Sequence, residues 1–187
     1  KSSEAVSTTG TKSGCMKWYV FNDKEGNATV NVILDHNTTA NVAWNSAGNN
    51  SEMKEVAEAL KTDTSTWKNT ARLITANEVA KITGNTGFDA SKENQEWFYL
   101  DSNNQTQTAS STNKSKYAWL FDYTNECTNY GCNISDSSTN GYWISSPYKG
   151  NSTHAWHVDR DGNLYGRVTY AYYGVRLVIT ISKSDIS

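Results

Sequence analysis

Alternating apolar and polar residues predict a β-hairpin near the start of the chain. Residues 17–21 form a strand-like aromatic run, and residues 28–34 alternate well enough to return as its partner. The polar residues between them are typical of a turn, and a shorter strand is expected at 41–44. Residues 1–14 are rich in Ser, Thr and Gly without apolar periodicity. We therefore expect a flexible leader followed by one domain at 15–187.

Helical spacing replaces the alternation in the middle of the chain. Met53, Val56, Ala57 and Leu60 recur at helical intervals, which predicts a helix over 51–60 with one apolar face. A Thr-x-x-Glu capping box at 75–78 predicts a second helix over 77–82, which ends at a Thr-Gly pair.

The rest of the chain reads as short aromatic strands and loops. Strands are expected at 96–100, 117–121, 141–147, 154–158, 164–168 and 175–181, with a polar surface loop over 101–116. The Asp-Gly pair at 161–162 is typical of a hairpin turn. The last strand is the most apolar stretch, so we expect it to be central in a sheet.

Three tryptophans within these segments are expected in the core: Trp119, Trp143 and Trp156. Arg176 is expected to be half-buried, donating to backbone carbonyls.

Composition favours recognition by hydrogen bonding and stacking. Of 187 residues only 19% are charged, the net charge is −2, and seven tryptophans and eleven tyrosines stand among many Asn, Ser and Thr. Such residues are favoured in binding loops. Scattered lysines without a basic stripe argue against nucleic acid as a partner, and no apolar run reaches the ~20 residues of a membrane span. The start lacks an initiator Met, so we expect a trimmed chain, with any membrane association through a segment outside this sequence.

The three cysteines are Cys15, Cys127 and Cys132. The short spacing of Cys127 and Cys132 allows a local disulfide in an oxidising compartment. Zinc is the competing interpretation, but two thiols without a nearby His pair make a poor tetrahedral set. Cys15 is expected to be a half-buried small hydrophobe, because nothing in the sequence supplies it with a base.

Several motifs follow one another along the chain: Val32–Thr39, Arg72–Glu78, Gly141-Tyr142-Trp143 with Ser146-Pro147, Ala155-Trp156-x-Val158 with Asp161–Leu164, and Tyr173-Gly174-Val175-Arg176 with Val178-Ile179. This ordered series resembles a group of uncharacterised bacterial surface domains, related to the formylglycine-generating-enzyme branch of the C-type-lectin-like fold. The resemblance covers most of the chain from about Cys15 onward, and one departure is Leu177, where the group usually has proline. The resemblance implies an α+β, C-type-lectin-like fold with paired N- and C-terminal strands, two short helices and a long loop-rich excursion.

The same branch includes the variable proteins of diversity-generating retroelements, and residues 148–173 look like their rewritten segment. In those proteins Asn, Ser, Thr, Tyr, His, Asp and Gly accumulate at surface positions of the segment. The resemblance implies that loops before the last strand form the binding face. The expected exposed patch consists of Tyr148, Asn151, His154, His157, Arg160, Tyr165, Arg167, Tyr170 and Tyr172.

No pattern in the chain points to catalysis, a metal or a cofactor. Residues 159–163 superficially resemble a calcium loop, but position twelve is Tyr170 where a bidentate Glu is needed, so a hairpin turn is favoured. His154 and His157 stand at odd spacing on a predicted strand, so they are expected on opposite faces as two surface imidazoles. No cysteine follows Cys132, whereas the formylglycine-generating enzyme uses a thiol pair near its C-terminus.

The sequence therefore predicts a non-enzymatic receptor- or adhesin-like domain outside the cell or on its surface. Its partner is expected to be a protein or glycan on another cell or on a phage. A structural pilin-like subunit and a degenerate enzyme of the formylglycine-generating type remain as alternatives.

Overall fold

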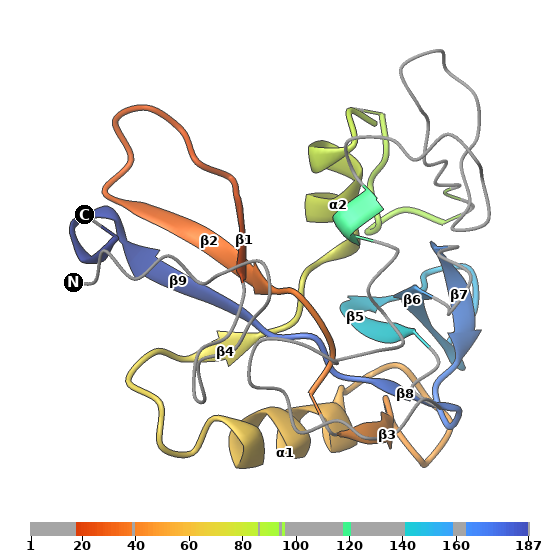
Figure 1. Cartoon of the computed structure of the whole chain (residues 1–187). Coiled ribbons are helices and arrows are strands. Elements are labelled where there is room, and N and C mark those ends of the chain that lie inside the picture. Colours follow the sequence, from red (N-terminus) through yellow and green to blue (C-terminus); the bar gives the residue numbers. More distant parts are fainter. Residues whose placement is uncertain are drawn as a thin grey trace.

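The computed structural model describes residues 18–38, 40–85, 87–93, 95, 118–120, 141–158 and 164–186. Within these ranges the chain is α+β, with two sheets and two α-helices (Figure 1). The α+β class expected from the sequence is thus confirmed. No helix in the described ranges is long and apolar enough to cross a membrane.

The first sheet joins the two ends of the described chain. Its order is β1 (Trp18–Phe21), β2 (Thr29–Leu34), β9 (Val178–Ser182) and β4 (Ala71–Arg72), all antiparallel. The predicted hairpin is present, and β9 lies inside the sheet as its apolar sequence predicted. The expected pairing of first and last strands needs correction, because β9 pairs with β2, the returning strand of the hairpin, and not with β1.

The second sheet carries the C-terminal strands. Its order is β3 (Asn41–Ala43), β8 (Tyr172–Gly174), β5 (Tyr142–Pro147), β6 (His154–Val158) and β7 (Leu164–Val168). All neighbours are antiparallel except β5 and β8. Strand β8 was not predicted. The expected strand over 175–181 is wrong at its start, because β9 begins only at Val178.

The two helices occur where their patterns predicted them, with shifted bounds. Helix α1 spans Lys54–Asp63 and buries Val56 and Leu60, whereas Ala57, expected on the apolar face, is exposed. Helix α2 spans Ala76–Ile82 and has the predicted capping box. The predicted strand at 117–121 is wrong in its described part, since Ala118–Leu120 is a 3₁₀ turn, η1. A second 3₁₀ turn, η2, spans Lys183–Asp185.

Two apolar clusters lie on opposite faces of the second sheet. One joins α2 and the first sheet to Tyr142, Ile144 and Trp156. The other places Trp143 and Ala155 against buried residues of α1. Trp143 and Trp156 are core residues as predicted, and Trp119 packs against the first cluster while only partly buried. Because β6 is covered on both faces, its residues 155–158 are all buried.

Arg176 ties the 3₁₀ turn η1 to the end of β2. Its guanidinium is fully buried and donates to the carbonyls of Leu34, Asp35, Trp119 and Leu120. The prediction of backbone carbonyl partners is confirmed, although the side chain is buried and not half-buried. Its Cζ lies 5.1 Å from the centre of the Tyr142 ring. Burial raises the pKa of the Tyr142 phenol, and the nearby cation offsets this only in part.

A close backbone crossing fixes the start of β5 against the end of β8. The Gly174 amide donates to the Gly141 carbonyl at 3.0 Å, and the Asn37 side chain donates to the same oxygen at 2.8 Å. A Cβ on Gly174 would lie 2.7 Å from that oxygen and would also collide with the Asn37 side chain. Only glycine fits here, because no side chain can occupy the space between the two strands.

Several sequence predictions fall outside the described residues. These are the leader at 1–14, the strand at 96–100, the loop at 101–116, the turn at 161–162, the three cysteines with the disulfide Cys127–Cys132, and Arg160.

Candidate binding face

Strand β7 is the edge of the second sheet and keeps a two-residue alternation. Leu164 is buried and Gly166 and Val168 are half-buried, while Tyr165 and Arg167 are exposed. Successive side chains of a strand point to opposite faces. Tyr165 and Arg167 therefore project together from one face of the sheet, as the predicted patch requires.

His157 does not belong to an exposed patch. It pairs with Tyr165 across β6 and β7, so both side chains lie on one face. The imidazole is fully buried among the rings of Trp143, Tyr165 and Tyr173, with centroids 4.3 to 5.8 Å away. Its Nδ1 lies 3.0 Å from the Tyr165 carbonyl. The prediction of a surface imidazole is wrong, because β6 is an interior strand covered on both faces.

Tyr148 lies on the other face of the sheet. Its ring meets Trp156 edge-on at 5.0 Å and fills the space above Gly166, where a Cβ would approach the ring to 2.8 Å. It is half-buried against the first apolar cluster. Since Trp156 pairs with Gly166 whereas Tyr165 alternates with Gly166, Tyr148 and Tyr165 point to opposite sides. The predicted patch is therefore divided by the sheet itself.

The turn between β5 and β6 is fixed by a neighbouring loop. The side-chain amide of Asn50 donates to the carbonyls of Tyr148, Asn151 and His154, at 2.9, 3.1 and 2.7 Å. The backbone amide of Asn50 donates to the Ser152 carbonyl. Asn50 was missed by the sequence analysis, since one asparagine in a polar loop gives no pattern that distinguishes it. Its position shows that the turn is a supported part of the structure.

Asn151 and His154 take part in the internal bonding of this turn. The Asn151 Oδ1 accepts from the Thr153 hydroxyl at 2.8 Å, and the same hydroxyl lies 2.9 Å from His154 Nδ1. Asn151 is exposed and His154 half-buried. Both keep an accessible portion, and one polar side-chain atom of each, Asn151 Oδ1 and His154 Nδ1, has a partner within the turn.

Tyr170 and Tyr172 are the most exposed tyrosines among the described residues. They are 56% and 64% accessible, against 37% for Tyr165. Tyr170 belongs to the turn after β7, and its ring reaches Gly48, whose Cβ would lie 3.7 Å away. Tyr172 opens β8 opposite Ala43. The backbone beneath is held by Thr169, whose carbonyl accepts from the amides of Trp44 and Asn45.

Besides Asn151, four residues of the predicted patch are exposed within the described ranges, and we call them the β7–β8 face: Tyr165, Arg167, Tyr170 and Tyr172. They lie on two strands and the turn that joins them, which Figure 1 shows beside β5 and β6. Because Tyr173 packs on His157, on the Tyr165 side of the sheet, its neighbour Tyr172 points to the other side. Arg167 supplies the charge of this face. Its guanidinium has no hydrogen bond or ion pair within the described ranges, so it is available to a ligand.

The β7–β8 face is suited to contact, and no described feature gives it a catalytic group. In the described ranges no three His, Cys, Asp or Glu side chains gather to hold a metal ion. Two clefts in these ranges lie elsewhere, one beside α2 and one at the end of α1. Phenol rings with one guanidinium can stack on a ligand and donate hydrogen bonds to it.

Comparison with known proteins adds no family to this picture. No model of a protein family, no curated protein and no solved structure matches the chain.

Proposed function

We propose that this chain is a ligand-binding domain displayed outside the cell or on its surface, and that the β7–β8 face contacts the ligand. One observation carries the proposal. Three of the five large exposed hydrophobic residues in the described ranges are Tyr165, Tyr170 and Tyr172, all within eight positions of each other. Exposed tyrosines beside an exposed arginine are typical of interaction sites, where Tyr and Arg supply much of the binding energy.

The support beneath this face favours the same function. Tyr165 packs on a buried imidazole, and the turn that bears Tyr170 is held by backbone bonds to the loop at 44–45. Rings presented on a fixed backbone lose little conformational entropy on binding. A face that is rigid in its backbone and tolerant in its exposed side chains can accept different residues without loss of the fold.

We propose a C-type-lectin-like arrangement as the finer description of the fold. The last strand lies in the same sheet as the N-terminal hairpin, and a second sheet holds the strands that precede it. Two short helices accompany these sheets. Those features agree with the arrangement that the motif resemblance implies.

The ligand is proposed to be a protein or glycan on another cell or on a phage. Both classes offer flat surfaces that tyrosines can stack on and hydrogen-bond. The test is direct binding of the purified domain to arrayed surface glycans and surface proteins, measured as saturation curves. Saturable binding at micromolar concentration or below is expected for at least one ligand. Absence of saturable binding to every member of both arrays would contradict the proposal.

A diversified C-terminal segment is a separate part of the proposal. The test is sequencing of this gene across a natural population of its host. Substitutions are expected to concentrate at Tyr165, Arg167, Tyr170 and Tyr172 in adenine-containing codons. The buried Trp143, His157 and Gly174 are expected to be constant. Substitutions spread evenly over the chain would remove the retroelement hypothesis and leave the binding proposal to the array experiment.

A further inference from the structure

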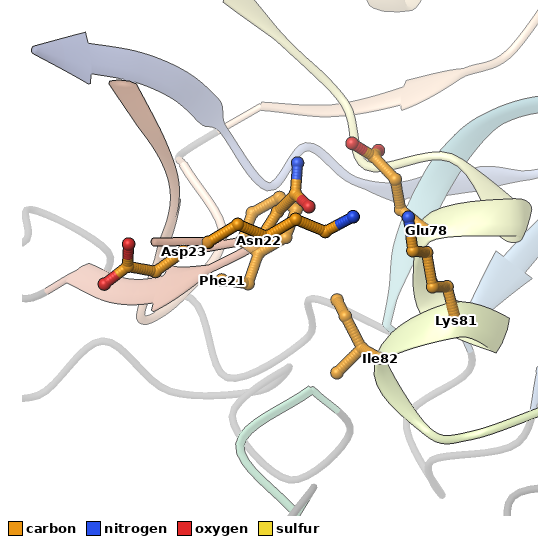
Figure 2. Close-up of a pocket in the computed structure, with 7 residues that line it drawn as sticks. Phe21, Asn22, Asp23, Glu78, Lys81 and Ile82 are labelled. Atoms are coloured by element: carbon orange, nitrogen blue, oxygen red, sulfur yellow. The ribbon is translucent and has the colours of Figure 1, made fainter. Parts of the chain in front are cut away.

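A cleft separates the β1–β2 turn from helix α2. None of its lining residues belongs to the β7–β8 face. Its volume is about 270 Å³, and it is lined by Phe21, Asn22, Asp23, Lys24, Glu78, Lys81 and Ile82. Figure 2 shows Phe21 and Asn22 facing α2, with Lys81 and Ile82 across from them and Asp23 turned away. The cleft therefore has apolar walls from two elements and polar groups at its edge.

The two carboxylates of the cleft are already occupied. Asp23 binds Lys183 at 2.6 Å, and Glu78 accepts from both terminal nitrogens of Arg72, at 2.6 and 2.8 Å. Partial burial acts to raise the pKa of Glu78, but the bonds from Arg72 and Thr75 outweigh it and hold that pKa below its ordinary value. Each of the two acids is thus paired with a cation of its own.

The remaining polar groups of the cleft are donors without partners. The side chains of Lys24 and Lys81 are exposed and have no hydrogen bond or ion pair within the described ranges, and neither has the Asn22 amide. The two lining carboxylates are bound by Arg72 and Lys183, so the ammonium groups of Lys24 and Lys81 are in excess at the cleft. An anionic group is the ligand chemistry that these donors favour.

The apolar walls define the rest of the ligand. Phe21 is buried and Ile82 half-buried, and both belong to the first apolar cluster or pack against it. A volume near 270 Å³ is at the small end of ligand sites, which suits a fragment and not a large cofactor. We infer that this cleft binds a small carboxylate that carries one apolar group, with the carboxylate at Asn22, Lys24 and Lys81 and the apolar group against Phe21 and Ile82.

The test is a titration of the ¹⁵N-labelled protein with phenylacetate, followed by amide chemical shifts. Saturable shifts are expected at residues 21–24 and 78–82, with a dissociation constant on the order of 1 mM for a ligand of this size. Acetate lacks the ring and 2-phenylethanol lacks the charge, so each is expected to bind roughly tenfold more weakly. Equal binding of 2-phenylethanol, or no saturable shifts with phenylacetate, would overturn the inference.

Lysine variants distinguish binding in the cleft from nonspecific binding of anions by the protein. The double change Lys24→Gln with Lys81→Gln is expected to weaken phenylacetate binding roughly tenfold, because it removes both free ammonium groups. The matched control is Lys54→Gln, an exposed lysine at the start of α1. An equal loss of phenylacetate affinity in the control would show that binding depends on the overall charge of the protein, and it would overturn the inferred site. Both lysines are exposed, so the folded spectrum is expected to persist.

Discussion

The ring of Tyr148 occupies the space in which any other residue at position 166 would place its side chain. A Cβ on Gly166 would lie 2.8 Å from two carbons of that ring, and Tyr148 also meets Trp156 edge-on. Tyr148 is therefore part of the packing on one face of the second sheet. Tyr165, its neighbour in the predicted patch, projects from the other face.

Replacement of Tyr148 by alanine is expected to reduce stability and leave the β7–β8 face in place. Loss of a half-buried aromatic side chain should lower the free energy of unfolding by about 2–3 kcal/mol. The matched control, Tyr172→Ala, removes an exposed ring and should change it by less than about 0.5 kcal/mol. Urea denaturation followed by tryptophan fluorescence measures both. Equal losses in the two variants would place Tyr172 in the core and contradict the assignment.

Arg176 is expected to be among the most sensitive positions in the chain. Arg176→Met removes the guanidinium donor from four carbonyls, at Leu34, Asp35, Trp119 and Leu120, of which Leu120 keeps the Tyr142 hydroxyl as a donor. A loss of about 3 kcal/mol or more is expected, because buried acceptors are left unsatisfied. Arg167→Met is the control, since Arg167 is exposed on β7, and it should cost less than about 0.5 kcal/mol. Thermal and urea unfolding of the pair provide the comparison, and a mild effect at position 176 would be inconsistent with its four bonds.

Glu78 is expected to make stability depend on pH in the acid range. Its pKa is lowered in the folded protein by Arg72 and Thr75 in spite of partial burial. The stabilisation is therefore present above the ordinary carboxyl pKa of about 4.3 and is lost as the pH falls through the lower folded value. Glu78→Gln keeps an acceptor for the capping box but removes the charge, so a loss of about 1 kcal/mol at pH 7 is expected.

The pH profile of that variant distinguishes the ion pair from simple packing. Between about pH 5 and pH 3 the wild type should lose more stability than Glu78→Gln, so that the two curves approach each other. Glu58→Gln, an exposed change on α1, should follow the wild type throughout. Parallel curves for wild type and Glu78→Gln would show that the charge of Glu78 contributes nothing.

Local patterns predicted the elements that depend on neighbours in the sequence. The hairpin of β1 and β2 follows from alternation, and the start of α2 follows from Thr75 and Glu78, whose reciprocal bonds are both present. The interior position of β9 follows from its apolar residues. Each of these is decided within about ten residues, which is the range over which sequence periodicity carries information.

The site depended on contacts that no local pattern contains. His157 is buried because β6 has neighbours on both edges and an apolar cluster on each face, which removes the alternation that would mark a surface residue. Tyr148 follows an irregularity in the pairing of β5 with β6, between Trp143 and Pro147. Such a shift changes the face to which later side chains point. The exposed residues of β7 were predictable because an edge strand keeps its alternation.

The most direct test of the proposed binding face compares two double variants against one ligand found on the arrays. Tyr170→Ala with Tyr172→Ala removes two rings of the β7–β8 face, while Val20→Ala with Ile186→Ala removes exposed apolar side chains from the first sheet and the C-terminal turn. The first pair is expected to weaken binding at least tenfold with an unchanged unfolding curve, and the second to leave the dissociation constant within about twofold. Unchanged affinity in the tyrosine variant, or an equal loss in the control, would contradict the account.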